Sequence, residues 1–153
     1  MADVIVLGDV NVDLIGHFDS YPTQGQDALA SSIELYAGGS AANTATVLAQ
    51  IGVEVNLIAR IGSDPIGIKA LRALQEAGVI LNSLQRDATT MTGLMVIIVT
   101  PDGERTMLGY RGANVWADAD QIREEEFRQA RLFHLSGYAL LTDPQRTAAL
   151  RAL

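Results

Sequence analysis

Cysteine is absent from this chain of 153 residues, and histidine occurs only twice. Without cysteine the chain can form no disulfide framework, thiolate nucleophile or thiolate metal site. Two isolated histidines also cannot build a histidine-rich metal site. We expect His134, inside the apolar run 132–135, to be a core or strand residue rather than a catalytic one.

The chain also lacks an excess of basic residues and a long apolar run. Its formal net charge is -7. This charge disfavours a nucleic acid or an anionic membrane surface as partner, because both attract concentrated Lys and Arg. The longest apolar run, 94–99, is too short to cross a bilayer. Strand-like residues 4–7 follow the start without a basic leader or signal-type segment, so we expect a cytoplasmic protein.

What the chain does contain is enough apolar side chains for one ordinary domain, since 48% of its residues are hydrophobic. Their spacing predicts strands that alternate with helices, which is typical of a parallel sheet covered by helices. Pro65 fits the first position of one helix, and Gly78 fits its end. The expected strands are 4–7, 53–59, 81–85 and 131–135, and the expected helices are 41–51, 65–77 and 120–130.

Four further segments have the composition of strands but no regular crossover helices between them. Two of them are joined by Pro101-Asp102-Gly103-Glu104, which is typical of a hairpin turn with glycine at a positive φ. Such strands need a sheet of their own, separate from the parallel one. They are 13–18, 32–36, 92–100 and 105–111.

The most informative motif is the run Gly38-Gly39-Ser40-Ala41-Ala42-Asn43, between an expected strand and an expected helix. Adjacent glycines allow a sharp turn and leave room for a ligand to approach the main chain. Gly39 would lie at the helix N-terminus, where free N–H groups and the helix dipole favour oxygen-rich ligands. The Asn43 amide can both donate and accept hydrogen bonds, which suits the hydroxyls of a polyol.

A second motif, Gly8-Asp9-Val10-Asn11-Val12-Asp13, follows the first expected strand. A period of two places Asp9, Asn11 and Asp13 on one side, which should face the ligand. The Asp13 carboxylate can accept hydrogen bonds from two neighbouring hydroxyls, so it is a candidate sugar anchor; the alternative is a solvated turn acid. Asn11 is the next candidate. Asp9 either joins them or bonds backbone N–H groups at the strand end.

The glycine-rich run, followed by Ala45, Gly52 and Gly62, resembles the first signature of the PfkB family of ribokinase-like carbohydrate kinases. The resemblance implies an α/β ribokinase-like fold, in which a parallel Rossmann-like sheet flanked by helices carries a small β-sheet lid. It implies that the lid covers the sugar and mediates homodimerisation, that ATP with Mg²⁺ is the phosphoryl donor, and that Asp13 anchors the sugar. Similar motifs cover nearly the whole chain: 8–13, 62–67, 102–105 and 110–114.

Arg111 ends an expected strand near the sugar pocket. Its planar guanidinium can clamp a substrate carboxylate or phosphate, or the transferring phosphoryl group; a surface arginine is the equal alternative. Asn114 and the backbone of Gly112 are secondary candidates, whereas Asp64 is expected to cap the helix that begins at Pro65. The predicted substrate-binding residues are therefore Asn11, Asp13, Gly38, Gly39, Asn43 and Arg111.

The chain stops inside an apolar helical pattern, 145–153, without a capping glycine. Kinases of the resembled family continue with a Gly-Ala-Gly-Asp motif whose aspartate is the catalytic base, and this motif does not occur here. We therefore expect an N-terminal half with no catalytic residue of its own and with most of the ATP site elsewhere. The favoured function is ATP-dependent phosphorylation of a sugar, sugar acid or nucleoside; the alternative is a noncatalytic sugar-binding or dimerisation half-protein.

Overall fold

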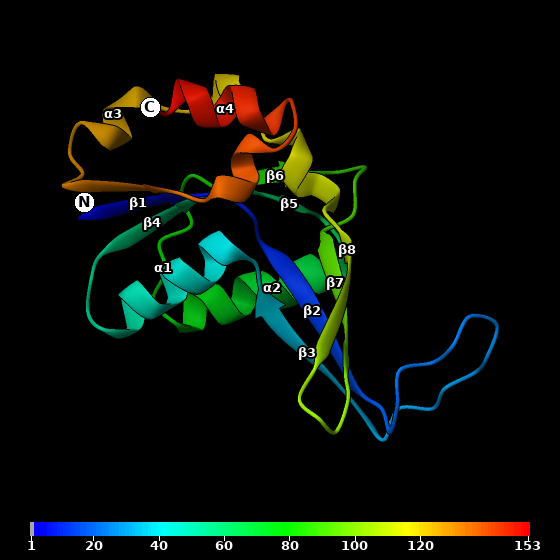
Figure 1. Ribbon diagram of the computed structural model, residues 1–153. Helices are drawn as coiled ribbons and strands as arrows, with labels where there is room; N and C mark the ends of the chain where they lie inside the picture. Colours follow the sequence, from blue (N-terminus) through cyan, green and yellow to red (C-terminus); the bar gives the residue numbers. More distant parts are fainter. Residues whose placement is uncertain (1) are drawn as a thin grey trace.

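The computed structural model describes residues 2–153, and its centre is a parallel sheet with the strand order β4-β1-β9 (Figure 1). Val4 pairs with Val55 on one side and with Leu132 on the other. Because the three strands are parallel, their carboxyl ends meet at one edge of the sheet, which is where open α/β sheets bind ligands. The strands are β1 Val4–Leu7, β4 Val55–Ile58 and β9 Leu132–Leu135.

Helices cover both faces of this sheet: α1 and α2 lie on one face, and α3 and α4 lie on the other (Figure 1). All residues of β1 and β4 are buried, as expected for a parallel sheet between helices. Asp64 caps α2 as predicted, because its Oδ1 accepts a hydrogen bond from Gly67 N at 3.0 Å. None of the helices in residues 2–153 has the length and apolarity to span a bilayer. The helices are α1 Ser40–Gln50, α2 Pro65–Glu76, α3 Glu124–Phe127 and α4 Gln145–Arg151.

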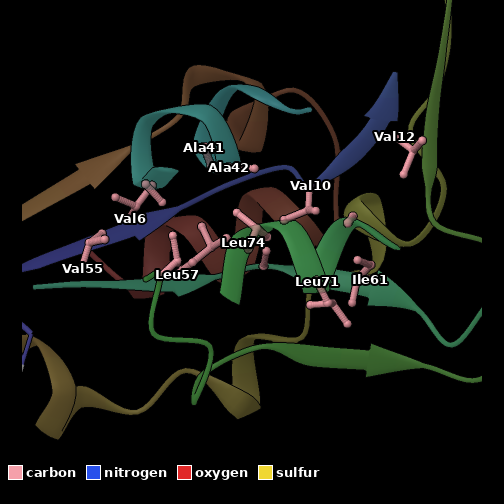
Figure 2. Packing of buried hydrophobic residues seen from close by; sticks show 14 of the residues in the cluster. Val6, Val10, Val12, Ala41, Ala42, Val55, Leu57, Ile61, Leu71 and Leu74 are labelled. Atoms are coloured by element: carbon pink, nitrogen blue, oxygen red, sulfur yellow. The ribbon is translucent and has the colours of Figure 1, made fainter. Parts of the chain in front are cut away.

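Two clusters of buried side chains hold the helices to the sheet. The larger one joins β1 and β4 to α1 and α2, and Figure 2 shows Val6, Leu57 and Leu74 within it. The other cluster lies on the opposite face and includes Ile5 from β1 and Ala149 from α4. Burial of one large aliphatic side chain contributes about 1.5–3 kcal/mol. The two clusters therefore hold the sheet and helices together and keep the end of β1 in a defined position.

A second sheet, with the strand order β3-β2-β7-β8, projects away from the helices (Figure 1). Pairing is antiparallel between β2 and β3 and between β7 and β8, whereas β2 and β7 pair in parallel. Gly103 in the β7–β8 turn has a φ of 84°, which agrees with the predicted hairpin. The strands are β2 Asn11–His17, β3 Ser32–Gly38, β7 Gly93–Val99 and β8 Arg105–Tyr110.

The predicted helix 120–130 was wrong in its extent. The segment instead forms a 3-10 helix and the short α3, separated by Ile122 and Arg123. Ile122 has an extended backbone with φ -79° and ψ 118°, and its side chain packs in the second core cluster. A continuous helix is therefore interrupted where this side chain reaches the core. The 3-10 helices of the chain are Gly112–Trp116, Ala119–Gln121 and Gly137–Leu140.

The predicted strand 81–85 is displaced toward the C-terminus. Leu84 N donates to the Leu81 carbonyl, so this stretch turns instead of extending. The strand that follows, β6 Gln85–Asp87, pairs in parallel with β5 Arg60–Gly62, which continues the direction of β4.

Candidate functional site

A cavity of about 370 Å³ lies where the β1–β2 junction, the N-terminus of α1 and the second sheet meet. Five of the six predicted substrate-binding residues line it, although they come from segments far apart in the sequence. Polar side chains form one part of the wall and apolar side chains form another. The lining residues are Asp9, Asn11, Asp13, Gly39, Ser40, Asn43, Met95, Ile97, Met107, Gly109, Arg111, Tyr138 and Leu141.

Asp13 brings a carboxylate without a protein partner to this cavity. Its Oδ1 is shielded from solvent and accepts no hydrogen bond from residues 2–153. Burial raises the pKa of the Asp13 carboxyl above its usual value, because the charged form loses hydration. A carboxylate in this state gains strongly from ligand hydroxyl groups, which can donate to it.

Two adjacent glycines shape the floor beneath Asp13. A Cβ at Gly38 would lie 2.3 Å from Asp13 Oδ2, so the missing side chain leaves space for the carboxylate. Gly38 thus lies behind Asp13 rather than among the lining residues. Gly39 is the N-cap of α1 with a φ of 101°, and its Cβ would lie 2.4 Å from the Asp9 carbonyl oxygen. Glycine therefore lets α1 begin directly against the β1–β2 junction.

Asn11 is held in place by a second asparagine. Asn114 is fully buried, its Nδ2 donates to Asn11 Oδ1 at 2.8 Å, and its Oδ1 accepts from Val10 N at 2.8 Å. Gly93 makes room for this pair, because a Cβ there would lie 2.1 Å from Asn11 Oδ1. With Oδ1 already bonded, the Asn11 Nδ2 group remains as a donor for a ligand.

Arg111 belongs to a closed polar cluster with Asp9 and Gln145. Its Nε donates to Asp9 Oδ2 at 3.1 Å, and its Nη2 donates to Asp9 Oδ1 at 3.0 Å. Gln145 Nε2 donates to Asp9 Oδ1 at 2.6 Å, and Arg111 also donates to the Tyr138 carbonyl and the Thr142 hydroxyl. Asp9 is 4% exposed. Asp9 therefore borders the cavity with Asn11 and Asp13, but its carboxylate pairs with side chains instead of backbone N–H groups, and it joins the β1–β2 junction to the end of β8 and to α4.

Beside Asp13, the same face of the second sheet is apolar, since Met95 is the register partner of Asp13 on the neighbouring strand. Met95 and Ile97 come from β7, and Met107 comes from β8. Gly109 leaves room for the Met95 side chain, because a Cβ at Gly109 would lie 2.8 Å from the Met95 sulfur. A further methionine, Met91, is not among the residues that line the cavity and is 42% exposed.

Sequence reasoning missed three residues of this region. Gly93 had a readable signal, because a lone glycine at the start of an apolar strand often marks a close approach. Gln145 follows Pro144 at a helix start, where a polar residue is ordinarily exposed, yet it is 1% exposed. Nothing in the sequence around Tyr138 indicates that it reaches the cavity.

A wider groove of about 680 Å³ lies beside β5 and β6 and reaches α4. Its Arg60 and Asp87 form an ion pair at 3.0 Å. Hydrogen bonds from the backbone of Thr90 and Thr89, together with Arg60, hold the pKa of Asp87 well below its usual range. The Asp87 carboxylate is thus already satisfied within the protein. The Asp13 carboxylate at the smaller cavity has no such partner, so we place the candidate site there.

The chain has clear relatives among carbohydrate kinases. An ATP-dependent ribose-1-phosphate kinase of Halopiger xanaduensis is 35% identical over 136 residues, which are 89% of this chain and 46% of that protein. Fructokinase-1 of Zea mays is 30% identical over 118 residues, 76% of this chain and 36% of that protein. The structure of a fructokinase from Halothermothrix orenii matches 98% of this chain and 51% of its own, with a TM-score of 0.86 and 27% identity.

This chain therefore spans about half the length, or less, of the proteins it resembles. The matched solved structure establishes the ribokinase-like α/β fold expected from the sequence. The profile of the pfkB family carbohydrate kinases matches residues 1–153, that is, the whole chain. The chain belongs to the pfkB family of carbohydrate kinases.

Proposed function

We propose that this chain is the sugar-orienting, N-terminal part of one kinase domain that uses ATP to phosphorylate a hydroxyl of a sugar or sugar-like substrate. The observation that carries the proposal is the half-buried Asp13 carboxylate, whose shielded Oδ1 has no partner among residues 2–153, at a cavity of about 370 Å³. Neighbouring hydroxyls of a sugar ring are the donors that such an acceptor lacks. Membership of the family supplies phosphoryl transfer as the class of reaction.

Each predicted residue has a role in this proposal. Asp13 accepts hydrogen bonds from two hydroxyls, with Gly38 leaving space for its carboxylate, and Asn11 donates to a third substrate oxygen. The N-terminus of α1 at Gly39 and the exposed Asn43 amide hold the far side of the ring. Holding one hydroxyl in line with the donor supplies orientation, which is a large part of catalysis in phosphoryl transfer.

Arg111 contributes less than its charge suggests. Its Nε and Nη2 groups are bonded to Asp9, and its Nη1 donates to Thr142 Oγ1 at 3.2 Å. One Nη1 hydrogen remains, because a guanidinium carries five N–H donors. In our proposal Arg111 borders the substrate and gives at most this one hydrogen bond to a hydroxyl.

We also propose that the β3-β2-β7-β8 sheet is a lid that keeps water from the substrate and that joins two copies of the chain. The outer strands β3 and β8 have one unpaired edge each, and such edges pair readily with another chain. Apolar side chains on both strands are exposed: Ile33, Leu35, Tyr36, Met107, Leu108 and Tyr110. Light scattering at high concentration tests this part, and a monodisperse monomer would contradict it.

The phosphoryl donor in this proposal is ATP with Mg²⁺, in keeping with the ATP-dependent relative from Halopiger. Residues 2–153 contain no group of three His, Asp or Glu side chains placed to hold a metal ion. We place the metal and most of the ATP site outside this chain.

An assay of ADP release over ribose, fructose, nucleosides and sugar acids tests the proposed function. We expect a longer protein, in which residues 1–153 are followed by the C-terminal half typical of this family, to release ADP with at least one of these substrates. Residues 1–153 alone should release none, because the sequence holds no Gly-Ala-Gly-Asp motif. If the longer protein releases no ADP with any substrate, the kinase proposal is wrong.

The absence of that motif from the sequence also favours a second candidate, a noncatalytic sugar-binding or dimerisation protein. Calorimetry with the same sugars separates the two functions. Sugar binding without ADP release by the longer protein would favour the second candidate.

A further inference from the structure

The charges around the cavity are unevenly satisfied. Among the described residues that line it, Arg111 is the one cation, and Asp9 and Asp13 are the two anions. Arg111 and Asp9 form an ion pair at 2.9 Å, and their side chains are 24% and 6% exposed. With Asp13 ionised, this part of the site therefore carries a net negative charge and offers no unpaired cation to a ligand.

The geometry of the ion pair leaves Arg111 no second pair of parallel N–H groups with which to bind an anion. Planar recognition of a phosphate or carboxylate by arginine uses two parallel N–H groups. In Arg111 the Nε edge of the guanidinium is already bidentate on Asp9, and Nη2 also donates to the Tyr138 carbonyl at 3.0 Å. Gln145 bonds to both partners, with Nε2 on Asp9 Oδ1 and Oε1 on Arg111 Nη2, and so closes the cluster.

We propose that Asp9 sets the specificity of the site: by holding the Arg111 guanidinium, it restricts the cavity to uncharged hydroxylated substrates and disfavours sugar phosphates and sugar acids. Asp9 acts through Arg111 and is a positioning residue. The inference rests on the proposed function, because it specifies which class of sugar that same site takes. An anionic substrate would have to displace Asp9 from Arg111 and approach the Asp13 carboxylate, and like charges placed side by side disfavour binding.

The decisive variant is Asp9→Asn, which keeps the shape of the side chain and removes its charge. The Arg111 charge is then no longer neutralised, and part of its fork becomes available. We expect the affinity for a phosphorylated sugar, relative to its uncharged parent, to rise by about tenfold or more. A purely structural role of Asp9 would weaken both ligands alike and leave this ratio unchanged.

The test uses the longer kinase that contains these residues and two matched pairs of ligands, ribose with ribose 1-phosphate and fructose with fructose 6-phosphate. Calorimetric Kd values give the ratio within each pair for the unaltered protein and each variant. The unaltered protein should prefer the uncharged member. A preference for the phosphorylated member overturns this inference while it supports the sugar-kinase function; no binding of any member overturns both.

Two variants exclude simpler explanations. Asp13→Asn removes the same charge from the same cavity but leaves Arg111 paired, so it should weaken the uncharged sugar without an equal gain for the phosphorylated one. Asp9→Asn combined with Arg111→Gln should lose the gain of the single variant. If Asp13→Asn raises the ratio as much as Asp9→Asn does, net charge alone explains the selectivity and the role of Asp9 is refuted. If Asp9→Asn does not fold, a preference of the unaltered protein for the phosphorylated member still overturns the inference.

Discussion

Asp9 and Asp13 lie on the same side of one chain segment and border the same cavity, yet the protein treats their carboxylates in opposite ways. Asp9 accepts hydrogen bonds from Arg111 and Gln145. Asp13 accepts none from residues 2–153, and its Oδ1 is nevertheless buried. A burial cost of this kind is ordinarily removed by a partner inside the protein.

The difference separates architecture from ligand binding. Asp9 connects elements of the chain, so its ion pair and hydrogen bonds stabilise the folded state. Burial of Asp13 costs the empty protein stability, and hydrogen bonds from a ligand offset this cost. Neighbouring residues of identical chemistry can therefore be told apart by their partners, and each of the following experiments changes one side of this contrast.

Replacing Asp13 by alanine should have the largest effect, on catalysis. In the longer kinase we expect kcat/KM for the best sugar to fall. The fall should correspond to a loss of about 2–4 kcal/mol of transition-state stabilisation, because two charge-assisted hydrogen bonds to the substrate are lost. The affinity for ATP should change little, and the melting temperature should not fall, because alanine removes a carboxylate whose burial costs stability. An unaltered kcat/KM would show that the sugar site is elsewhere.

Replacing Asp9 by alanine should act on stability instead. The variant leaves the Arg111 guanidinium without its carboxylate, and we expect a loss of about 2–3 kcal/mol in urea denaturation, below the range for fully buried pairs because Arg111 is 24% exposed. Asp3→Ala is the matched control, since its pair with Arg131 is 3.8 Å long and exposed. If the Asp9 and Asp3 variants lose the same stability, the Asp9 ion pair contributes no more than an exposed pair, and the structural role given to Asp9 is wrong.

Gly38→Ala should reproduce part of the Asp13 defect without any change of charge. The new Cβ would lie 2.3 Å from Asp13 Oδ2 and would force the carboxylate aside. A displacement of this size should lower kcat/KM by about tenfold. Gly137→Ala is the control, because a Cβ at Gly137 meets no atom within 4 Å. If the Gly38 variant keeps full activity, the position of the carboxylate does not matter.

The smallest effect is a gain: Asp13→Asn should stabilise the empty protein at neutral pH by less than about 1 kcal/mol, because it removes a charge that burial penalises on a side chain that solvent still partly reaches. The sign follows from the pKa. Because burial raises the pKa of Asp13, the folded state binds its proton more tightly, and stability falls as pH rises from the unfolded pKa through the folded one. The advantage of the variant should vanish at a pH below both values, which urea titrations at several pH values can measure.

The sequence predicted the parts of the molecule that follow from local rules. Pro65 and Asp64 mark the start of α2, and Gly103 marks the hairpin, because capping and turn geometry depend on neighbouring residues. Period-two alternation correctly brought Asp9, Asn11 and Asp13 to one cavity. The separate fates of Asp9 and Asp13 were not predictable, because they depend on where Arg111 and Gln145 lie in space.

The same reason explains the errors in the elements. Ile122 ends a predicted helix because a core formed by distant residues accepts its side chain. The parallel pairing of β2 with β7 joins segments about 80 positions apart, and no local pattern announces it. Which predicted residues bind the substrate remains a prediction that the variants above can test.

The bond between Asp9 and Gln145 spans 136 positions of the chain. This separation in sequence also determines when the site can form during folding. During synthesis, Asp9 emerges long before its partner, and the cluster can close only when α4 has been made and has docked. Contacts of such sequence separation form slowly, because a long loop must close first. The cavity should therefore be among the last features to mature, and a nascent chain lacking α4 should hold its substrate poorly even though most of the lining residues are already present.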